Sequence, residues 1–358
     1  METVYGKTSP FIYLPLRRHA VLSIGPSITS DPTSFVDPAK WLSLSAADLM
    51  KLRISSITSL KPVHPERSIL DRDVVKLREV ALSQSHVDIE LNMINSKRKI
   101  YNDQFTGAIS VSGRLERVLN YSGTSFSRPV ERAYSDTTLK ASDAVRYLFE
   151  SDVSVYKIQQ LLSVGGLGIN RKLVATRWSI TAVDSVLSSQ MLRHIVHYNL
   201  LSDYMVGKSY IMGNRFAVIL EPENYSFEML ESWAPYNGTD KIIQMVANDS
   251  EGYFGRTDYA QDVEGAYYAA RLSVAKFLQK IKRQASVTVL MEVDRNWIPS
   301  LGVWRVREGV RLALENTSRF NDKDSTYNDA FGYMKTRKES WIISSSRFRQ
   351  IKMDEFFR

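Results

Sequence analysis

Cysteine is absent from this chain, and histidine occurs only five times. Without cysteine there can be no disulfide bond, no thiol nucleophile and no thiolate-bound zinc, and five scattered histidines offer little to a histidine-based metal site. We therefore expect no zinc and no required cofactor. A metal ion, if used, would be a hard cation such as Mg²⁺ or Mn²⁺ bound by carboxylates.

Long apolar runs are missing as well. No stretch approaches the roughly 20 apolar residues that a helix needs to cross a bilayer. The first residues, Met1 to Tyr5, lack the basic and apolar regions of a signal peptide. We therefore expect no membrane partner and a cytoplasmic location.

The overall composition is that of a folded protein. The 358 residues are 44% hydrophobic and 24% charged, which is typical of globular chains, and the length is sufficient for two domains. The formal net charge of +8 suggests a polyanionic partner such as DNA, although many basic proteins bind none.

Helical and strand patterns are mixed along the chain without regular alternation. Apolar spacing predicts helices over residues 71–83, 142–149, 155–163, 264–284 and 304–314, and Ser45 has the position of a helix cap. Apolar runs between turn signals predict strands over residues 11–16, 20–24, 87–94, 204–212, 215–220, 242–247 and 287–293, with a Gly213-Asn214 hairpin turn. The mixture predicts an α+β fold with largely antiparallel sheet elements packed with helices.

The last nine residues form the most specific short motif. Met353, Phe356 and Phe357 are spaced i, i+3, i+4, so one helical turn places them on one face, and Gln350 lies upstream for a polar contact. Residues 350–357 match the binding motif of the sliding clamp PCNA at every specified position. The alternative is an amphipathic turn that folds back on the protein's own core. The preceding serines, Ser344–Ser346, favour a flexible, solvated tether instead.

Arginine and aromatic residues are interleaved near residue 305. Guanidinium groups bind phosphates in pairs of hydrogen bonds and rings stack on bases, so Arg305, Arg307 and Arg311 are candidate contacts to nucleic acid. The alternative is a helix with these arginines in solvent and an apolar face turned inward, formed by Val303, Val306, Val310 and Leu314.

A second polar cluster lies at a predicted helix start. Ser179 is a plausible N-cap, and the helix N-terminus beside Arg177 and Trp178 would favour an anion such as phosphate. Alternatively Ser179 only caps the helix, Trp178 packs, and Arg177 pairs with Asp184. A nucleotide-dependent enzyme would need a preformed pocket at this string.

Four carboxylates are candidate catalytic or metal-binding residues. Paired carboxylates bind two metal ions in many nucleases, and the candidates here are Asp184, Asp249, Glu251 and Glu292. No complete nuclease motif accompanies them. Arg256 and Arg271 are candidate phosphate contacts; the alternative is that they form structural ion pairs with Asp249 and Glu251.

Three strings resemble motifs of the archaeal Nre DNA-repair family: residues 171–184, residues 249–256 with 267–272, and residues 302–308. Two positions depart from the usual pattern, Ala175 in place of proline and Ser185 in place of an acidic residue. The resemblance implies an Nre N-terminal domain over residues 1–240, an Nre C-terminal domain over 241–333, and a flexible basic tail over 334–358. Many relatives begin with a cysteine-rich zinc segment, which has no counterpart here.

Two hypotheses of different class follow. The first is a repair factor that contacts DNA and is recruited through PCNA without catalysis of its own. The second is a metal-dependent nuclease or another phosphodiester-cleaving enzyme. The two motif strings, residues 177–184 and 249–256, are further predicted to meet in one polar cleft.

Overall fold

The computed structural model describes residues 1–15, 22–31, 38–64, 68–103, 105–233, 245–294 and 302–349. The chain forms two compact units, the first built mainly from Met1–Val186 and the second mainly from the residues beyond. Both combine helices with mixed, largely antiparallel sheets, so the predicted α+β class is confirmed. Within the described residues, no helix combines the length and the apolar character that a membrane span requires.

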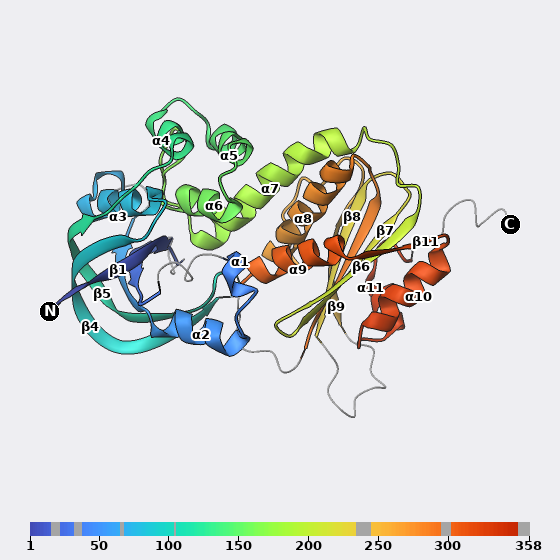
Figure 1. Ribbon diagram of the computed structural model, residues 1–358, viewed down its shortest axis with the longest axis horizontal. Helices are drawn as coiled ribbons and strands as arrows, with labels where there is room; N and C mark the ends of the chain where they lie inside the picture. The colour runs from blue at the N-terminus through green and yellow to red at the C-terminus, as the bar shows by residue number, and fades with distance from the viewer. Residues whose placement is uncertain are drawn as a thin grey trace. The chain divides into compact units, whose positions relative to one another are not determined.

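The first unit is built around a closed five-stranded barrel (Figure 1). Its strands occur in the order β1-β2-β3-β5-β4, and all neighbours are antiparallel except β3 and β5. Their bounds are β1 Glu2–Tyr13, β2 Leu22–Ile28, β3 Ile57–Val63, β4 Val87–Asp103 and β5 Gly107–Ser122. The helices are α1 Pro38–Trp41, α2 Ala46–Ser55, α3 Arg72–Leu82, α4 Arg128–Ser135, α5 Ala141–Glu150, α6 Val155–Ser163 and α7 Thr176–Ile195, with a 3₁₀ turn at Ser68–Leu70.

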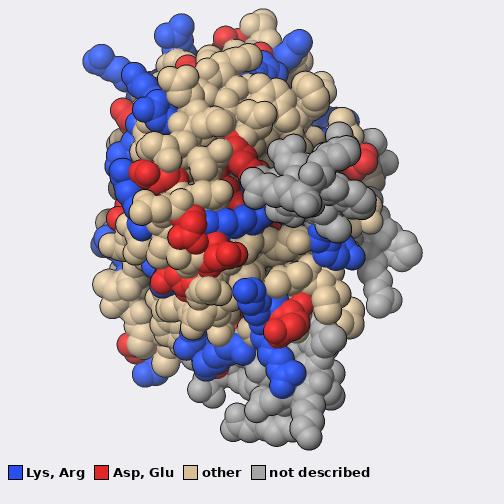
Figure 2. All heavy atoms as spheres, turned by 90° about the vertical axis from the view of Figure 1, so that its right-hand side faces the viewer, with Lys and Arg blue, Asp and Glu red and all other residues tan. Residues whose placement is uncertain are grey.

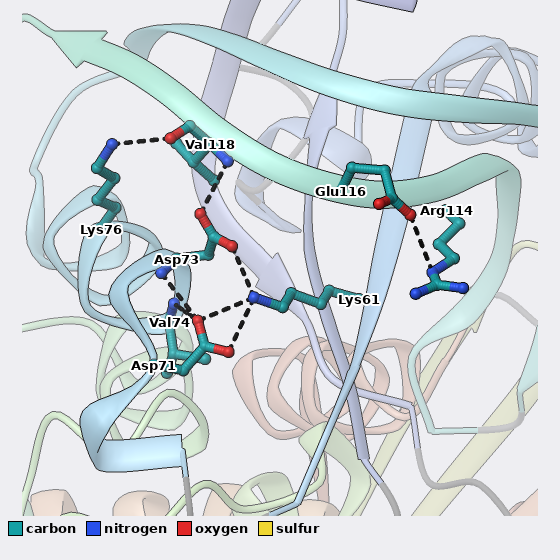
Figure 3. A network of polar contacts seen from close by, with 8 residues as sticks. All are labelled: Lys61, Asp71, Asp73, Val74, Lys76, Arg114, Glu116 and Val118. Carbon is teal, nitrogen blue, oxygen red and sulfur yellow. Dashed lines mark hydrogen bonds and ion pairs between the residues drawn. The ribbon is translucent and has the colours of Figure 1, made fainter. Parts of the chain in front are cut away.

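Helix α3, which lies between β3 and β4 in the chain, packs against the barrel strands β1, β2 and β5. Its buried residues, among them Val74 and Leu77, join the core formed by the inward side chains of the strands. A polar network fixes the start of the helix (Figure 3). The Asp71 carboxylate accepts from the main-chain N–H groups of Asp73 and Val74, and Lys61 of β3 binds the carboxylates of Asp71 and Asp73. Asp73 in turn accepts from the N–H of Val118 in β5 at 2.9 Å. The helix is therefore joined to two barrel strands.

Lys157 of α6 is half-buried against the C-terminal end of α3. Its ammonium donates to the carbonyl oxygens of Ala81, at 2.6 Å, and Ser83. Carbonyl groups at a helix C-terminus favour a cation. Burial acts in the opposite direction and lowers the pKa of Lys157 from 10.5 to about 7.

This burial predicts a pH dependence of stability. Between pH 7 and about 10.5 the unfolded chain binds more protons at Lys157 than the folded chain does, so this group raises the unfolding free energy as pH rises, by at most about 1.4 kcal/mol per pH unit. In denaturant unfolding from pH 7 to 10, the unfolding free energy of the wild type should rise relative to that of Lys157→Met. A stability difference that stays constant over this range would contradict the depressed pKa.

The second unit is a three-layer sandwich around a six-stranded sheet of order β11-β6-β7-β10-β8-β9, in which only β10 and β8 are parallel. Helices α8 and α9 cover one face and α10 and α11 the other (Figure 1). The strand bounds are β6 Tyr204–Ile211, β7 Asn214–Glu221, β8 Ser226–Trp233, β9 Val246–Glu251, β10 Ser286–Val293 and β11 Thr317–Phe320. The helices are α8 Gly265–Ile281, α9 Trp304–Glu315, α10 Lys323–Tyr333 and α11 Lys338–Ser344.

The segment preceding the clamp-like motif is packed, which corrects the tether predicted from residue 334. Trp341 of α11 is fully buried, and the Ser345 hydroxyl donates to Glu228 at 2.5 Å. Phe348 packs edge-on against Tyr327 and Phe331, with ring centroids 5.1 and 5.5 Å away. Of the three serines, Ser345 is buried and satisfies the buried Glu228, whereas Ser346 is exposed and donates its main-chain N–H to the same carboxylate at 2.8 Å. The motif residues Gln350, Met353, Phe356 and Phe357 lie outside the described residues.

Candidate functional site

The family-like string at residues 249–256 lies at the edge of the six-stranded sheet. Asp249 and Glu251 are two residues apart on β9, so both side chains point to the same face, and both are buried. A tight turn follows, in which the N–H of Gly255 donates to the carbonyl of Gly252 at 2.9 Å. Gly255 has φ +76°, which suits glycine.

The Asp249 carboxylate is occupied by three donors. Arg256 Nη1 binds one oxygen at 2.9 Å, and the main-chain N–H groups of Asp262 and Val263 bind the other at 2.9 and 2.8 Å. The Arg256 guanidinium also lies over the Tyr267 ring, 5.0 Å from its centroid. This arrangement fixes the loop after β9 and is that of a structural ion pair.

Glu251 forms a second, more deeply buried pair. Arg271 of α8 donates from Nε to Glu251 at 2.7 Å, and the Tyr225 hydroxyl donates to the same carboxylate at 2.6 Å. The other side of the guanidinium binds the hydroxyls of Ser188, at 2.9 Å, and Ser189, at 3.1 Å, on α7. Burial, reinforced by the nearby Glu251 charge, raises the pKa of Tyr225 well above its usual value. The tyrosine therefore remains a neutral donor to Glu251.

These ion pairs support an exposed aromatic turn. Phe254 is 98% exposed and Tyr253 is 39% exposed at the tip that follows Glu251. Their rings meet edge-on with centroids 5.3 Å apart, and the Tyr253 hydroxyl donates to the carbonyl of Val196 at 3.0 Å. The string thus places charge inside the unit and apolar rings at its surface.

Glu292 does not join Asp249 and Glu251. It is aligned with Ser232 of β8, which is aligned with Val246 of β9. Val246 lies five residues from Glu251, or about 17 Å along a strand. The Glu292 carboxylate accepts from the main-chain N–H groups of Lys335 and Thr336. In the part of the chain that the structure describes, no three acidic or histidine residues gather in a metal-binding group.

The string at residues 177–184 lies in α7, and its predicted cap is wrong. The helix begins at Thr176, three residues earlier, so the Ser179 hydroxyl is internal and donates back to the carbonyl of Thr176 at 2.9 Å. Thr176 holds the helix start through tertiary bonds: its N–H donates to the carbonyl of Leu14, and its hydroxyl accepts from the Leu14 N–H.

The other polar residues of this string have separate environments. The Arg177 guanidinium lies over the Phe105 ring, 4.3 Å from its centroid, while Trp178 is 53% exposed. Asp184 is fully buried and accepts from Gln159 Nε2 at 2.9 Å. Asp184 belongs to the first unit, whereas Asp249 belongs to the second. The shared cleft stays a prediction.

The arginines of α9 differ from one another. The predicted apolar face is confirmed, because Val303, Val306, Val310 and Leu314 are buried. Arg305 and Arg307 are buried too, at 7% and 5% exposure, which neither reading of the sequence predicted. Burial lowers the pKa of Arg305, against the effect of the nearby Glu231. Only Arg311 faces solvent, and it binds Glu308 and Glu315, each at 2.7 Å.

Figure 2 shows one face of the molecule, in which Asp and Glu side chains gather in the middle beside a short row of basic ones. Other Lys and Arg side chains lie toward its borders. The net positive charge therefore does not form a continuous basic surface on this face.

One exposed basic segment was not among the candidate sites predicted from the sequence. Lys97, Arg98 and Lys99 follow one another on β4, two residues before Tyr101, and all four are exposed. The sequence signal was available: three consecutive cations near an aromatic residue, in a stretch predicted to follow a strand.

Comparisons with known proteins identify the family to which the motif strings belong. Residues 1–237 match the family described as "Archaeal Nre, N-terminal" and residues 251–356 match "Archaeal Nre, C-terminal". The chain belongs to the archaeal Nre family, as its motifs predicted. No solved structure matches it.

Three curated relatives resemble nearly the whole chain. DNA repair protein NreB of Archaeoglobus fulgidus is 34% identical over 90% of this chain and 85% of the relative. DNA repair protein NreA of the same organism is 31% identical over 99% of this chain and 90% of the relative. DNA repair protein NreA of Haloferax volcanii is 30% identical over 88% and 79%.

Proposed function

We propose that this protein is a DNA repair factor that contacts DNA and is recruited by the sliding clamp PCNA. The repair role rests on the printed names of three relatives that resemble most of the chain. The recruitment rests on the C-terminal motif, in which Gln350, Met353, Phe356 and Phe357 have the required order and spacing. This motif is the single observation that carries the proposal.

The packing just before the motif supports a close connection to the clamp. Arg347 binds Glu221 and Glu223, and Phe348 packs on α10, so the chain is held against the second unit as far as Phe348, two residues before the motif begins. A clamp bound at residues 350–357 would therefore hold this unit nearby, because no long free linker lies between them.

We further propose that the protein acts on DNA without cleaving it, and that no metal is required. Asp249 and Glu251 accept from Arg256 and Arg271 at 2.9 and 2.7 Å, the pairing that the non-catalytic reading of the sequence predicted. A metal ion would have to displace these guanidinium groups, which cost several kcal/mol to leave buried without their partners. The alternative, a metal-dependent nuclease, would require that displacement.

A nuclease assay tests this choice. On branched and single-stranded DNA, with Mg²⁺ or Mn²⁺ and with or without PCNA, we expect cleavage to stay at the rate without protein. The melting temperature should also be unchanged by either metal, because a metal that binds the folded state raises it.

The matched variants for this assay are Asp249→Asn and Asp258→Asn; Asp258 is exposed. The nuclease hypothesis is supported, and the proposal of a non-cleaving repair factor is refuted, if wild type and Asp258→Asn cleave DNA with added metal whereas a folded Asp249→Asn does not. Circular dichroism establishes the folding of each variant.

A further inference from the structure

The barrel of the first unit has the connectivity of an oligonucleotide-binding (OB) barrel. Five strands close in the order β1-β2-β3-β5-β4, β3 and β5 are parallel, and α3 lies between β3 and β4 in the chain. OB barrels bind oligonucleotides on the face of the second and third strands, beside the loops that follow the first and fourth. Because fold alone does not establish function, the accessible side chains must decide where a ligand could bind.

Most of the usual face of such a barrel is covered in the residues that the structure describes. All seven residues of β2 are buried. The loop between β4 and β5 is held down by Arg53, which donates to the carbonyl oxygens of Ala108 at 2.9 Å and Thr106 at 2.6 Å. Phe105 in the same loop is 2% exposed beneath Arg177. A ligand on this barrel therefore needs another surface.

The far half of β4 offers one. β1 begins at Glu2, which is aligned with Met93, so β4 beyond Met93 pairs with β5 and with no other described strand. Figure 1 shows β4 and β5 as long curved strands around the barrel. On β5 the residues aligned with Lys99, Ile100 and Tyr101 are buried, whereas Arg114, aligned with Ile94, is exposed. On β4 both faces of the strand are accessible; the exposed residues are Ile94, Asn95, Lys97, Arg98, Lys99, Ile100 and Tyr101.

The chemistry of this edge fits a polyanion with bases. Lys97, Arg98 and Lys99 make no ion pair with a described carboxylate, in contrast to Arg114 of β5, which binds Glu116 at 3.1 Å (Figure 3). Tyr101 is 43% exposed at the end of the row, and its ring is available for stacking. Cations that follow a backbone and an aromatic ring that stacks on bases are the two elements of sequence-independent single-strand binding.

A purely protective role is the alternative. Lysines on an open strand edge prevent pairing with the edges of other molecules. That role needs charge on the edge but makes no use of the aromatic ring, so the two readings differ in what Tyr101 contributes.

We propose that single-stranded DNA binds along the edge of β4, with Lys97, Arg98 and Lys99 at phosphates and Tyr101 stacked on a base. The choice of DNA over RNA rests on the proposed repair function. The binding is sequence-independent, because the segment offers charge and a ring but no ordered set of groups that reads base edges.

Fluorescence anisotropy with labelled 20-nucleotide single strands tests the charge component, using the full chain. Lys97→Ala/Arg98→Ala/Lys99→Ala should weaken binding about tenfold or more and lower the slope of log K against log salt by about 2, because three single-strand phosphates lose their partners. Lys280→Ala/Lys282→Ala/Arg283→Ala is the matched control. It removes three exposed cations from the end of α8 and should change neither quantity.

Tyr101 tests the stacking component. Tyr101→Ala should weaken single-strand binding about fivefold to hundredfold with the salt slope unchanged, whereas Tyr101→Phe should bind like wild type, because stacking needs the ring and not the hydroxyl. If Tyr101→Ala binds like wild type while the triple variant only aggregates, the edge is protective and the proposal fails.

The remaining outcomes separate this inference from the proposed function. Absence of any DNA binding by wild type refutes the proposed function itself. DNA binding that survives in both the triple variant and Tyr101→Ala refutes only the β4 edge. If wild type binds an RNA strand of the same sequence more tightly than DNA, and both variants lose that binding, the choice of DNA is overturned. If the variants lose binding to duplex DNA but not to single-stranded DNA, the single-strand assignment is overturned.

Discussion

Replacing both Phe356 and Phe357 with alanine should abolish binding to the sliding clamp. Together with Met353, these rings supply most of the apolar area of the face that one helical turn of the motif would present. Aromatic anchors that fill a groove cost about 2–4 kcal/mol each when truncated, so the loss should exceed a hundredfold in affinity. Isothermal titration calorimetry of the full chain against PCNA measures it directly.

The packed segment before the motif supplies the control for this experiment. Phe348→Ala removes a ring that packs on Tyr327 and Phe331, so it should lower the melting temperature while leaving clamp affinity nearly unchanged. The Phe356→Ala/Phe357→Ala variant should do the reverse. Full clamp affinity in the double variant would refute recruitment through this motif.

Local signals in the sequence located most elements of both units. The helix predicted over residues 71–83 is α3, which begins after the cap Asp71 and ends before Ser83. Ser45 caps α2 as predicted, accepting from the N–H of Asp48. The predicted hairpin is β6–β7, but its turn is Met212-Gly213, both with positive φ, one residue earlier than expected.

Features that depend on distant contacts were not predicted. The start of α7 is set by Thr176, whose bonds to Leu14 span 162 residues, and this outweighed the local cap signal of Ser179. The barrel closes through β1 with β4 and β3 with β5, pairings that leave no local pattern. The length of β4, Val87–Asp103, exceeds the predicted strand because its last half follows β5 and carries mostly polar residues.

The ion-pair partners at the candidate site were predicted from the sequence, but the burial of its arginines was not. The sequence offered Arg256 and Arg271 as ion-pair partners of Asp249 and Glu251, and both pairs are present. It gave no reason to expect Arg305 and Arg307 inside the unit, because arginine is rarely so buried. Burial of such residues depends on which layers pack around α9, and this is a property of the whole fold.

Arg271→Met should destabilise the protein by about 3–5 kcal/mol, the usual cost of leaving one member of a buried ion pair without its partner. The Arg271 and Glu251 side chains are 5% and 0% exposed, and the guanidinium also satisfies Ser188 and Ser189 of α7. The same substitution at Arg311, which is 42% exposed, should change stability by no more than about 0.5 kcal/mol. Urea unfolding of the two variants measures the contrast.

A double-mutant cycle separates the ion pair from the packing of the arginine stem. Glu251→Gln removes the carboxylate's charge but keeps an acceptor for the Tyr225 hydroxyl, which donates to Glu251 at 2.6 Å. Adding it to Arg271→Met should recover part of the lost stability, because no buried charge then remains unpaired. If the two losses simply add, the pair contributes no coupling and Arg271 stabilises the unit by packing alone. A Glu251→Gln variant that is folded and more stable than wild type would instead indicate that the buried charges are kept for function at a cost in stability, which would reopen the case for chemistry at this site.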